Sequence, residues 1–225
     1  MGLASGRAQL FSKHGVAMLV LGILLTAAAC GGSDDDTNDE AAPSPGRSAS
    51  GTPPEWPAPQ DPAERVQAAG LEMETREALQ THRHTHLDVF FNGSPVTVPA
   101  GLGIDISDPG VQHAEDADGH PGYGGITQCD NPCISPLHTH DESGVLHTEA
   151  SSDDLRTLGQ LFVEWDVRLD ASCVGEYCTP DTDVAVYVDG DRFDGNPADI
   201  PLTDQTEIAI VIGSPPDSIP ADPGF

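Results

Sequence analysis

The sequence contains a single lysine, Lys13, and after residue 29 its only permanent cations are seven arginines. Residues 30–225 combine those seven arginines with all 37 acidic residues, which gives them a formal charge of −30. Binding to the phosphates of nucleic acid needs a positive surface, so nucleic acid is not an expected partner. The same lack of positive charge argues against binding to anionic lipid headgroups.

A dense acidic surface without lysine suggests a saline habitat. We predict that the free energy of unfolding rises steeply with salt, because dissolved ions screen the repulsion among the carboxylates. Denaturant unfolding in dilute buffer and in concentrated salt would measure this change. Equal stability under the two conditions would contradict the prediction.

The sequence also lacks an apolar run of the roughly 20 residues that a membrane-spanning helix needs. Residues 16–29 (VAMLVLGILLTAAA) form an apolar run of 14, and they follow Arg7 and Lys13 without any acidic residue. A basic start, a short apolar segment and small residues before a break are typical of a signal peptide. We therefore assign residues 1–29 to a signal peptide.

The segment Ala27-Ala28-Ala29-Cys30 resembles the bacterial lipobox, whose cysteine is lipidated and becomes the new N-terminus. The usual motif has Leu where this chain has Ala27, so ordinary cleavage after the alanines is the alternative. Residues 30–60 are acidic and rich in Pro, Gly and Ser, as in a disordered tether with little to bury. We expect Cys30 to carry lipid and to anchor an extracytoplasmic domain to the cell membrane.

Cysteine is scarce after the lipobox. The four that remain are Cys129, Cys133, Cys173 and Cys178. Outside the cytoplasm, an even number of cysteines predicts disulfides, here two. Three connectivities are open. In the local one, Cys129–Cys133 and Cys173–Cys178 would each close one loop. The alternative is thiolate metal ligation, but the spacings CxxxC and CxxxxC differ from the CxxC of zinc sites.

Residues 61–81 are predicted to form a helical lead-in that begins at Asp61-Pro62. Gly70 interrupts it, and a second helical piece is predicted over residues 71–80. Two β-hairpins follow. The stretch HTHLDVFFNGSPVTVPA predicts the first hairpin, because Asn92-Gly93 strongly favours a two-residue turn. One face of that hairpin is apolar, with Leu87, Val89, Phe91, Val96 and Val98. The other face carries His82, His84, His86 and Asp88.

The stretch PLHTHDESGVLHTE predicts a second hairpin with its turn at residues 141–144. In that register His138 faces His147 across the ladder, and their Cβ atoms should lie about 4.5–5.5 Å apart. His140 and Glu149 share the same face, because side chains two residues apart on a strand point the same way. Three imidazoles therefore converge on one cross-strand pair.

The remaining pattern predicts one helix and further strands. Thr157 begins a capping box, after which Leu158, Leu161, Phe162 and Trp165 recur at helical spacing. The segment EIAIVIG is predicted to form a strand that is buried on both faces. Residues 101–135 are predicted to form a long loop, and residues 214–225 a loosely held tail. Residues 82–213 are thus predicted to form one small α+β domain with a mixed sheet, similar in general shape to β-grasp folds.

Clustered histidines indicate a transition-metal site, because neutral imidazole suits Zn and Cu(II). The predicted ligands are His84, His86, His138, His140 and His147. Additional or supporting ligands are His82, Asp88, Asp141 and Glu149. The two clusters would form one site if the hairpins adjoin. The alternative is a solvated, hydrogen-bonded sheet surface without metal. Met73 is the only methionine after the signal peptide, which argues against a Met-rich Cu(I) site.

The stretches HRHTHLDVFFNGSPVTVPAG and CISPLHTHDESGVLHTEA, followed by TLGQLF and EIAIVIG, resemble a group of exported bacterial proteins without an established activity. The resemblance covers roughly residues 66–213, and it implies an extracytoplasmic compartment and a His-rich site but no reaction. Three hypotheses follow. The first is a metal-binding lipoprotein for capture, buffering or delivery. The second is a metal-dependent enzyme using the same histidines, and the third is a tethered interaction module without metal.

Overall fold

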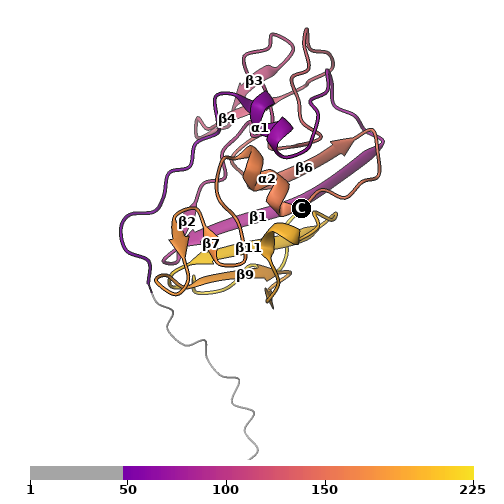
Figure 1. Cartoon of the computed structure of the whole chain (residues 1–225). Coiled ribbons are helices and arrows are strands. Elements are labelled where there is room, and N and C mark those ends of the chain that lie inside the picture. The colour runs from indigo at the N-terminus through magenta and orange to yellow at the C-terminus, as the bar shows by residue number, and fades with distance from the viewer. Residues whose placement is uncertain (1–47) are drawn as a thin grey trace, which may run out of the picture. The chain divides into compact units, whose positions relative to one another are not determined.

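The computed structural model of the chain describes residues 48–225 (Figure 1). The predicted signal peptide, the lipobox with Cys30 and most of the predicted tether lie outside these described residues. No helix in the described part of the chain is long and apolar enough to cross a membrane.

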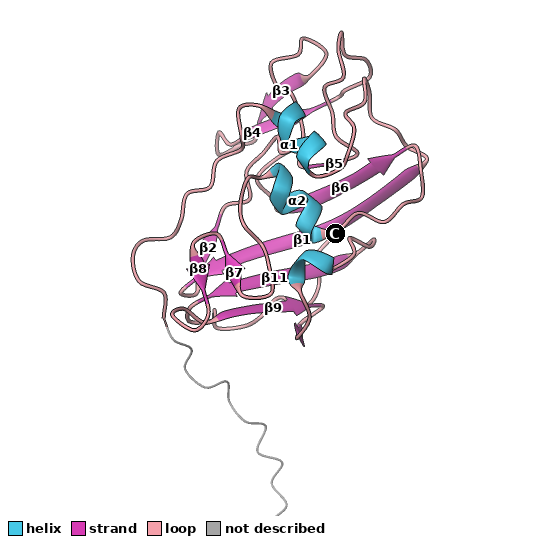
Figure 2. Cartoon of the chain, viewed as in Figure 1, coloured by secondary structure: helices cyan, strands magenta, loops and turns pink. Residues whose placement is uncertain are grey.

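A mixed sheet of seven strands forms the centre of the described domain (Figure 2). Its strands are β1 (Thr81–Phe91), β2 (Ser94–Val96), β5 (Leu137–His138), β6 (Val145–Ala150), β9 (Val184–Val188), β10 (Asp191–Phe193) and β11 (Thr206–Ile212). Their order is β10–β9–β11–β1–β6–β5, and β2 pairs with the end of β1. Only β1 and β11 are parallel among these pairs.

Two α-helices lie on one face of this sheet, α1 (Pro62–Ala68) and α2 (Leu158–Glu164) (Figure 1). A short 3-10 helix, η1 (Pro197–Asp199), and two small ladders complete the described elements. The ladders pair β3 (Gln112–Glu115) with β4 (Pro121–Gly124), and β7 (Cys173–Val174) with β8 (Tyr177–Cys178). The predicted α+β class with a mixed sheet is confirmed, whereas a β-grasp fold is not established.

Both predicted hairpin registers are present where strands form. Val89 pairs with Val96 across the Asn92-Gly93 turn, and His138 pairs with His147. Asn92 and Gly93 both adopt positive φ, at 49° and 80°, as a two-residue hairpin turn requires. All five residues of the predicted apolar face are buried in the main core.

The capping box of α2 is formed as predicted. The Thr157 hydroxyl accepts a hydrogen bond from the backbone N–H of Gln160, whose side-chain oxygen accepts one from the N–H of Thr157. The four apolar residues of the predicted stripe, Leu158, Leu161, Phe162 and Trp165, are buried against the sheet. These contacts fix α2 over the face of β1 that is opposite the histidines.

The second helical piece predicted at residues 71–80 is absent from the structure. Helix α1 ends in a Schellman motif, in which the N–H of Leu71 bonds to the carbonyl of Val66 and that of Gly70 to Gln67. Gly70 takes φ of +73°, so the chain leaves the helix there. Residues 71–80 then contain no helix, and the backbone of Glu74 pairs with Ile134.

Residues 101–135 are not a simple loop as predicted. They carry the β3–β4 ladder and a second small core of Ile104, Val111, Ile126, Cys129, Cys133 and Ile134. The disulfide Cys129–Cys133 is part of this core, and Cys173–Cys178 closes the other loop. The predicted two disulfides are confirmed, and of the three connectivities that the sequence left open the structure has the local one. These four cysteines therefore hold no metal as thiolates.

The chain on both sides of the domain packs more closely than predicted. Trp56, within the predicted tether, lies 5.9 Å from Trp165 between ring centroids, and its carbonyl accepts a hydrogen bond from the Trp165 indole. The tail passes close to Gly93 at Pro215 and reaches the His84 ring at Phe225. The tail therefore lies on the face of β1 opposite the helices.

Candidate metal centre

The pairing of β1 with β6 joins the two predicted histidine clusters. His82 lies opposite Glu149 and His84 lies opposite His147 in this antiparallel ladder. Strand β5 adds His138, which lies opposite His147 on the other side of β6. The hairpins thus adjoin, and their histidines share one face of the sheet.

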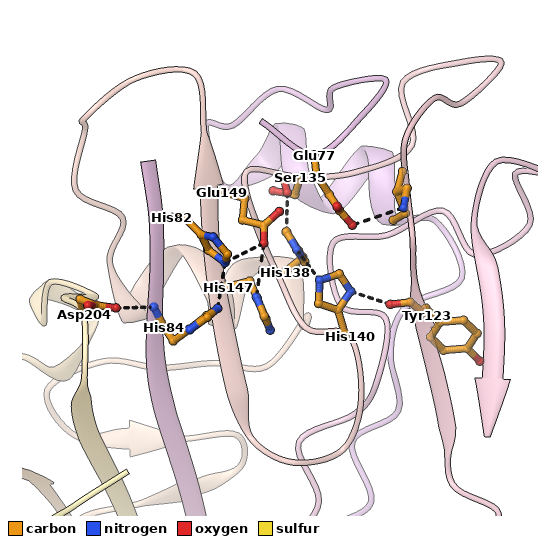
Figure 3. Close-up of polar contacts among 11 residues, drawn as sticks. Glu77, His82, His84, Tyr123, Ser135, His138, His140, His147, Glu149 and Asp204 are labelled. Carbon is orange, nitrogen blue, oxygen red and sulfur yellow. Dashed lines mark hydrogen bonds and ion pairs between the residues drawn. The ribbon is translucent and has the colours of Figure 1, made fainter. Parts of the chain in front are cut away.

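Six side chains form what is called here the histidine cluster: His82, His84, His138, His140, His147 and Glu149. The cluster contains two groups whose ligand atoms lie within 4.8 Å of one another. One group is His138, His140, His147 and Glu149, and the other is His82, His84 and His147. His147 belongs to both, with one ring pair on either side of it (Figure 3).

Two backbone carbonyls orient the inner ring pair, His138 and His140. Nδ1 of His138 donates to the carbonyl of Ser135 at 2.8 Å, and Nδ1 of His140 donates to the carbonyl of Tyr123 at 2.5 Å. When each Nδ1 carries the proton of a neutral ring, each Nε2 carries a lone pair. These two Nε2 atoms lie 3.3 Å apart.

Two facing lone pairs at that distance repel each other unless a cation lies between them. Nitrogens bound at 2.0–2.1 Å to one tetrahedral metal ion would lie about 3.3 Å apart. The observed separation of the His138 and His140 nitrogens equals that edge. The pair is thus preorganised for a shared cation, either a proton or a metal ion.

The buried position of His138 keeps its ring neutral. Its exposed fraction is 0%, and burial lowers its pKa to about 3, with the neighbouring His140 and His147 adding to the effect. The pKa of His84 is also lowered, first by burial and then by His147 and His82. Neutral imidazole is the form that binds metals, so both rings are ready to ligate.

Glu149 supplies the one carboxylate of the cluster. Its Oε1 lies 3.2 Å from His82 Nε2 and 3.5 Å from His147 Nδ1, and the side chain is only 5% exposed. Burial alone would raise the pKa of Glu149, but the contact with His147 and the nearby His138 and His82 lower it below its ordinary value. The carboxylate therefore stays charged, as a metal ligand should be.

Two buried atoms of the cluster make no hydrogen bond within the described residues, His147 Nδ1 and Glu149 Oε2. Buried polar atoms are almost always paired, because leaving one without a partner costs on the order of 1–3 kcal/mol. A cation bound by the cluster would give both atoms a partner. The donor set of imidazoles and one carboxylate therefore fits a divalent transition metal.

His86, a predicted ligand, lies outside the histidine cluster. Its Nδ1 pairs with Glu207 at 2.8 Å and its Nε2 with the carbonyl of Ser143 at 2.8 Å, so both nitrogens are engaged. The hydrogen bond with Glu207 raises the pKa of His86 despite partial burial. With Asp88 and Glu207 it forms a separate carboxylate-rich group. The predicted supporting residue Asp141 also lies elsewhere, exposed in the β5–β6 turn, where it accepts the N–H of Ser143.

Sequence reasoning missed several groups that hold the cluster. The carbonyls of Ser135 and Tyr123 carry no side-chain signal, and Tyr123 comes from β4, inside the segment predicted as a loop. Glu164 of α2 is buried behind the site and accepts a hydrogen bond from the Ser135 hydroxyl at 2.6 Å. Burial raises the pKa of Glu164 to about 8. Its position in α2, beside the apolar stripe, gave no hint of this contact.

Comparison with protein-family models, with curated proteins and with solved structures finds no significant match.

Proposed function

We propose that this chain is a lipid-anchored protein of the cell envelope whose histidine cluster captures and holds a divalent transition-metal ion. The observation that carries this proposal is the inner pair, His138 and His140, whose two Nε2 lone pairs face each other at 3.3 Å. Fixed carbonyl partners hold both rings in that orientation, so it does not depend on flexible side chains.

The ligand types favour Zn or Cu(II). Imidazole nitrogen suits both ions, and a carboxylate completes the set. The cysteines at residues 129–178 are in disulfides, and no methionine belongs to the histidine cluster. A soft ion such as Cu(I), which prefers sulfur, is therefore a poorer match.

Holding an ion is favoured over catalysis by the number of ligands. His138, His140, His147 and Glu149 supply four donors, which complete a tetrahedral shell. Catalytic zinc sites keep one position open for water or substrate, with three protein ligands. At the outer edge of the cluster, His82 has 46% of its side chain exposed, so an ion can enter from solvent.

The envelope location is supported by the sequence of residues 1–30. The basic start, the short apolar run and the lipobox-like cysteine favour export and lipid anchoring. The two disulfides are consistent with an oxidising compartment. The acidic composition of the chain would concentrate cations near the cluster.

Metal content tests the proposal. The full chain would be offered Zn or Cu(II), desalted in concentrated salt to remove ions held by surface acids, and assayed by mass spectrometry. We expect the chain to retain at least one ion. A triple variant, His84→Ala/His140→Ala/His147→Ala, should lose most of the ion, because it removes one ring of each pair and the ring between them. All three side chains are partly exposed, so the substitutions leave no large cavity.

The control variant is His113→Ala/His120→Ala, which removes two imidazoles from the β3–β4 hairpin outside the cluster. It should retain the ion like the unmodified chain. Loss of the ion in this control, or equal retention in the triple variant, would place the ion elsewhere and overturn the proposal. Circular dichroism would verify that each variant is folded.

A further inference from the structure

The histidine cluster offers more ligands than one ion can use. Five imidazoles and one carboxylate converge, whereas a tetrahedral ion takes four donors. The inner group of His138, His140, His147 and Glu149 already completes one shell. His82 and His84 are then left as an outer pair on β1, beside the shared His147.

The outer pair also brings two Nε2 atoms together. Nε2 of His82 and Nε2 of His84 lie 2.9 Å apart, within hydrogen-bond distance, and would move apart to about 3.3 Å around a tetrahedral ion. Glu149 Oε1 lies 3.2 Å from His82 Nε2, on the same side as these nitrogens. The ring centroids of His84 and His147 are 4.6 Å apart, so the outer pair reaches the shared ring directly.

Two members of the cluster can serve two ions at once. Glu149 has two carboxylate oxygens, and Oε2 makes no hydrogen bond within the described residues although it is buried. His147 has two ring nitrogens and stands between the inner and outer pairs, with ring centroids 4.4 Å from His140. Glu149 can therefore give one oxygen to each of two neighbouring ions. His147 can do the same with its two ring nitrogens when the second ion displaces its N–H proton to solvent, which leaves a bridging imidazolate.

The two pairs differ in their access to solvent. His138 is fully buried, whereas 46% of the His82 side chain is exposed, and His147 between them is 17% exposed. Asp204 accepts the backbone N–H of His84 at 2.9 Å, which places a second carboxylate beside the outer pair. An ion at the outer pair would exchange with solvent, and an ion at the inner pair would be retained.

We infer that the histidine cluster is a two-ion centre, with an outer position at His82 and His84 that loads the inner position through His147 and Glu149. This inference rests on the proposed function, because it assumes that the inner group binds a transition metal. The chemical class of both ions is a divalent metal that accepts imidazole, such as Zn or Cu(II).

Stoichiometry and spectroscopy together test the inference. The full chain, saturated with Zn and desalted in concentrated salt, should retain about two ions per chain. The variant His82→Ala/His84→Ala should retain about one, and the variant His138→Ala/His140→Ala about one that a chelator removes faster. With Cu(II), the unmodified chain should show magnetic coupling between two nearby ions by electron paramagnetic resonance. The outer-pair variant should show the spectrum of an isolated Cu(II).

The outer-pair variant changes only exposed or partly exposed positions, so we expect it to fold normally. Replacement of the buried His138 is more disruptive to folding. The control His113→Ala/His120→Ala should keep both ions. One ion in the unmodified chain, unchanged in the outer-pair variant, would overturn the two-ion inference and leave the proposed function standing. No ion in the unmodified chain would overturn both.

Discussion

Zinc is expected to raise the free energy of unfolding by about 4 kcal/mol when the free ion exceeds its dissociation constant about a thousandfold. The physical reason is that the inner ligands come from β5, β6 and the turn between them and meet only in the folded domain. The gain should disappear below about pH 6, because protonated imidazoles do not bind metals. Denaturant unfolding with and without zinc, near neutral pH and near pH 5, would measure both effects.

Magnesium at the same concentration is the control for that experiment. It screens the acidic surface as zinc does, but it prefers oxygen ligands and should add little at an imidazole site. The variant His84→Ala/His140→Ala/His147→Ala should show the same stability with either ion. A zinc effect that persists in this variant, or that is unchanged between neutral pH and pH 5, would contradict ligation by the cluster.

The substitution Glu164→Gln is expected to make the protein more stable at alkaline pH. Burial raises the pKa of Glu164 to about 8, from an ordinary value of 4.5. The folded protein therefore binds more protons than the unfolded chain between these values, and its stability falls as the pH rises through that window. A tenfold difference in proton affinity corresponds to about 1.4 kcal/mol. The free energy of unfolding of the unmodified protein therefore falls by a few kcal/mol by about pH 9.

Gln is a suitable replacement because it keeps the oxygen that accepts from Ser135 and cannot become charged. The difference in unfolding free energy between the two proteins, followed from about pH 4 to about pH 9, isolates the titration of this one group. We expect a small difference at acidic pH that grows in favour of the variant as the pH rises. A difference that does not vary with pH would show that Glu164 is not buried as a neutral acid.

The parts of the site that were predictable depend on local rules. Asn92-Gly93 fixes the first hairpin turn, and strand alternation then places His82 and His84 on one face. The opposition of His138 and His147 follows in the same way from the second turn. Turn chemistry and side-chain alternation act over a few residues, so a sequence shows them directly.

The parts that were missed depend on contacts between distant segments. His86 follows His84 by two residues on the same face of β1. Strand β11, however, brings Glu207 beside His86, and this contact keeps the His86 ring out of the histidine cluster. The apolar residues at 71–80 recur at helical spacing, but the αL conformation of Gly70 and the backbone pairing of Glu74 with Ile134 keep this segment from forming a helix. Periodicity does not reveal which neighbour a strand will meet.

The segment that carries Tyr123 shows the same limit. Its Gly, Asp and Pro content predicted a loop, but a disulfide and a few apolar residues give it a small core of its own. The carbonyl that orients His140 is therefore supplied from a place where composition predicted little order.

The central position of β11 has a consequence for how the chain tolerates truncation. This strand comes late in the sequence, yet it lies between β1 and β9 and is buried along its whole length. A chain that ended before Thr206 would leave β1 and β9 with long unpaired edges, next to apolar residues such as Val89 and Val186. Exposed edges of this kind recruit strands from other molecules. A shortened form that keeps every member of the histidine cluster would therefore tend to aggregate before it could bind an ion.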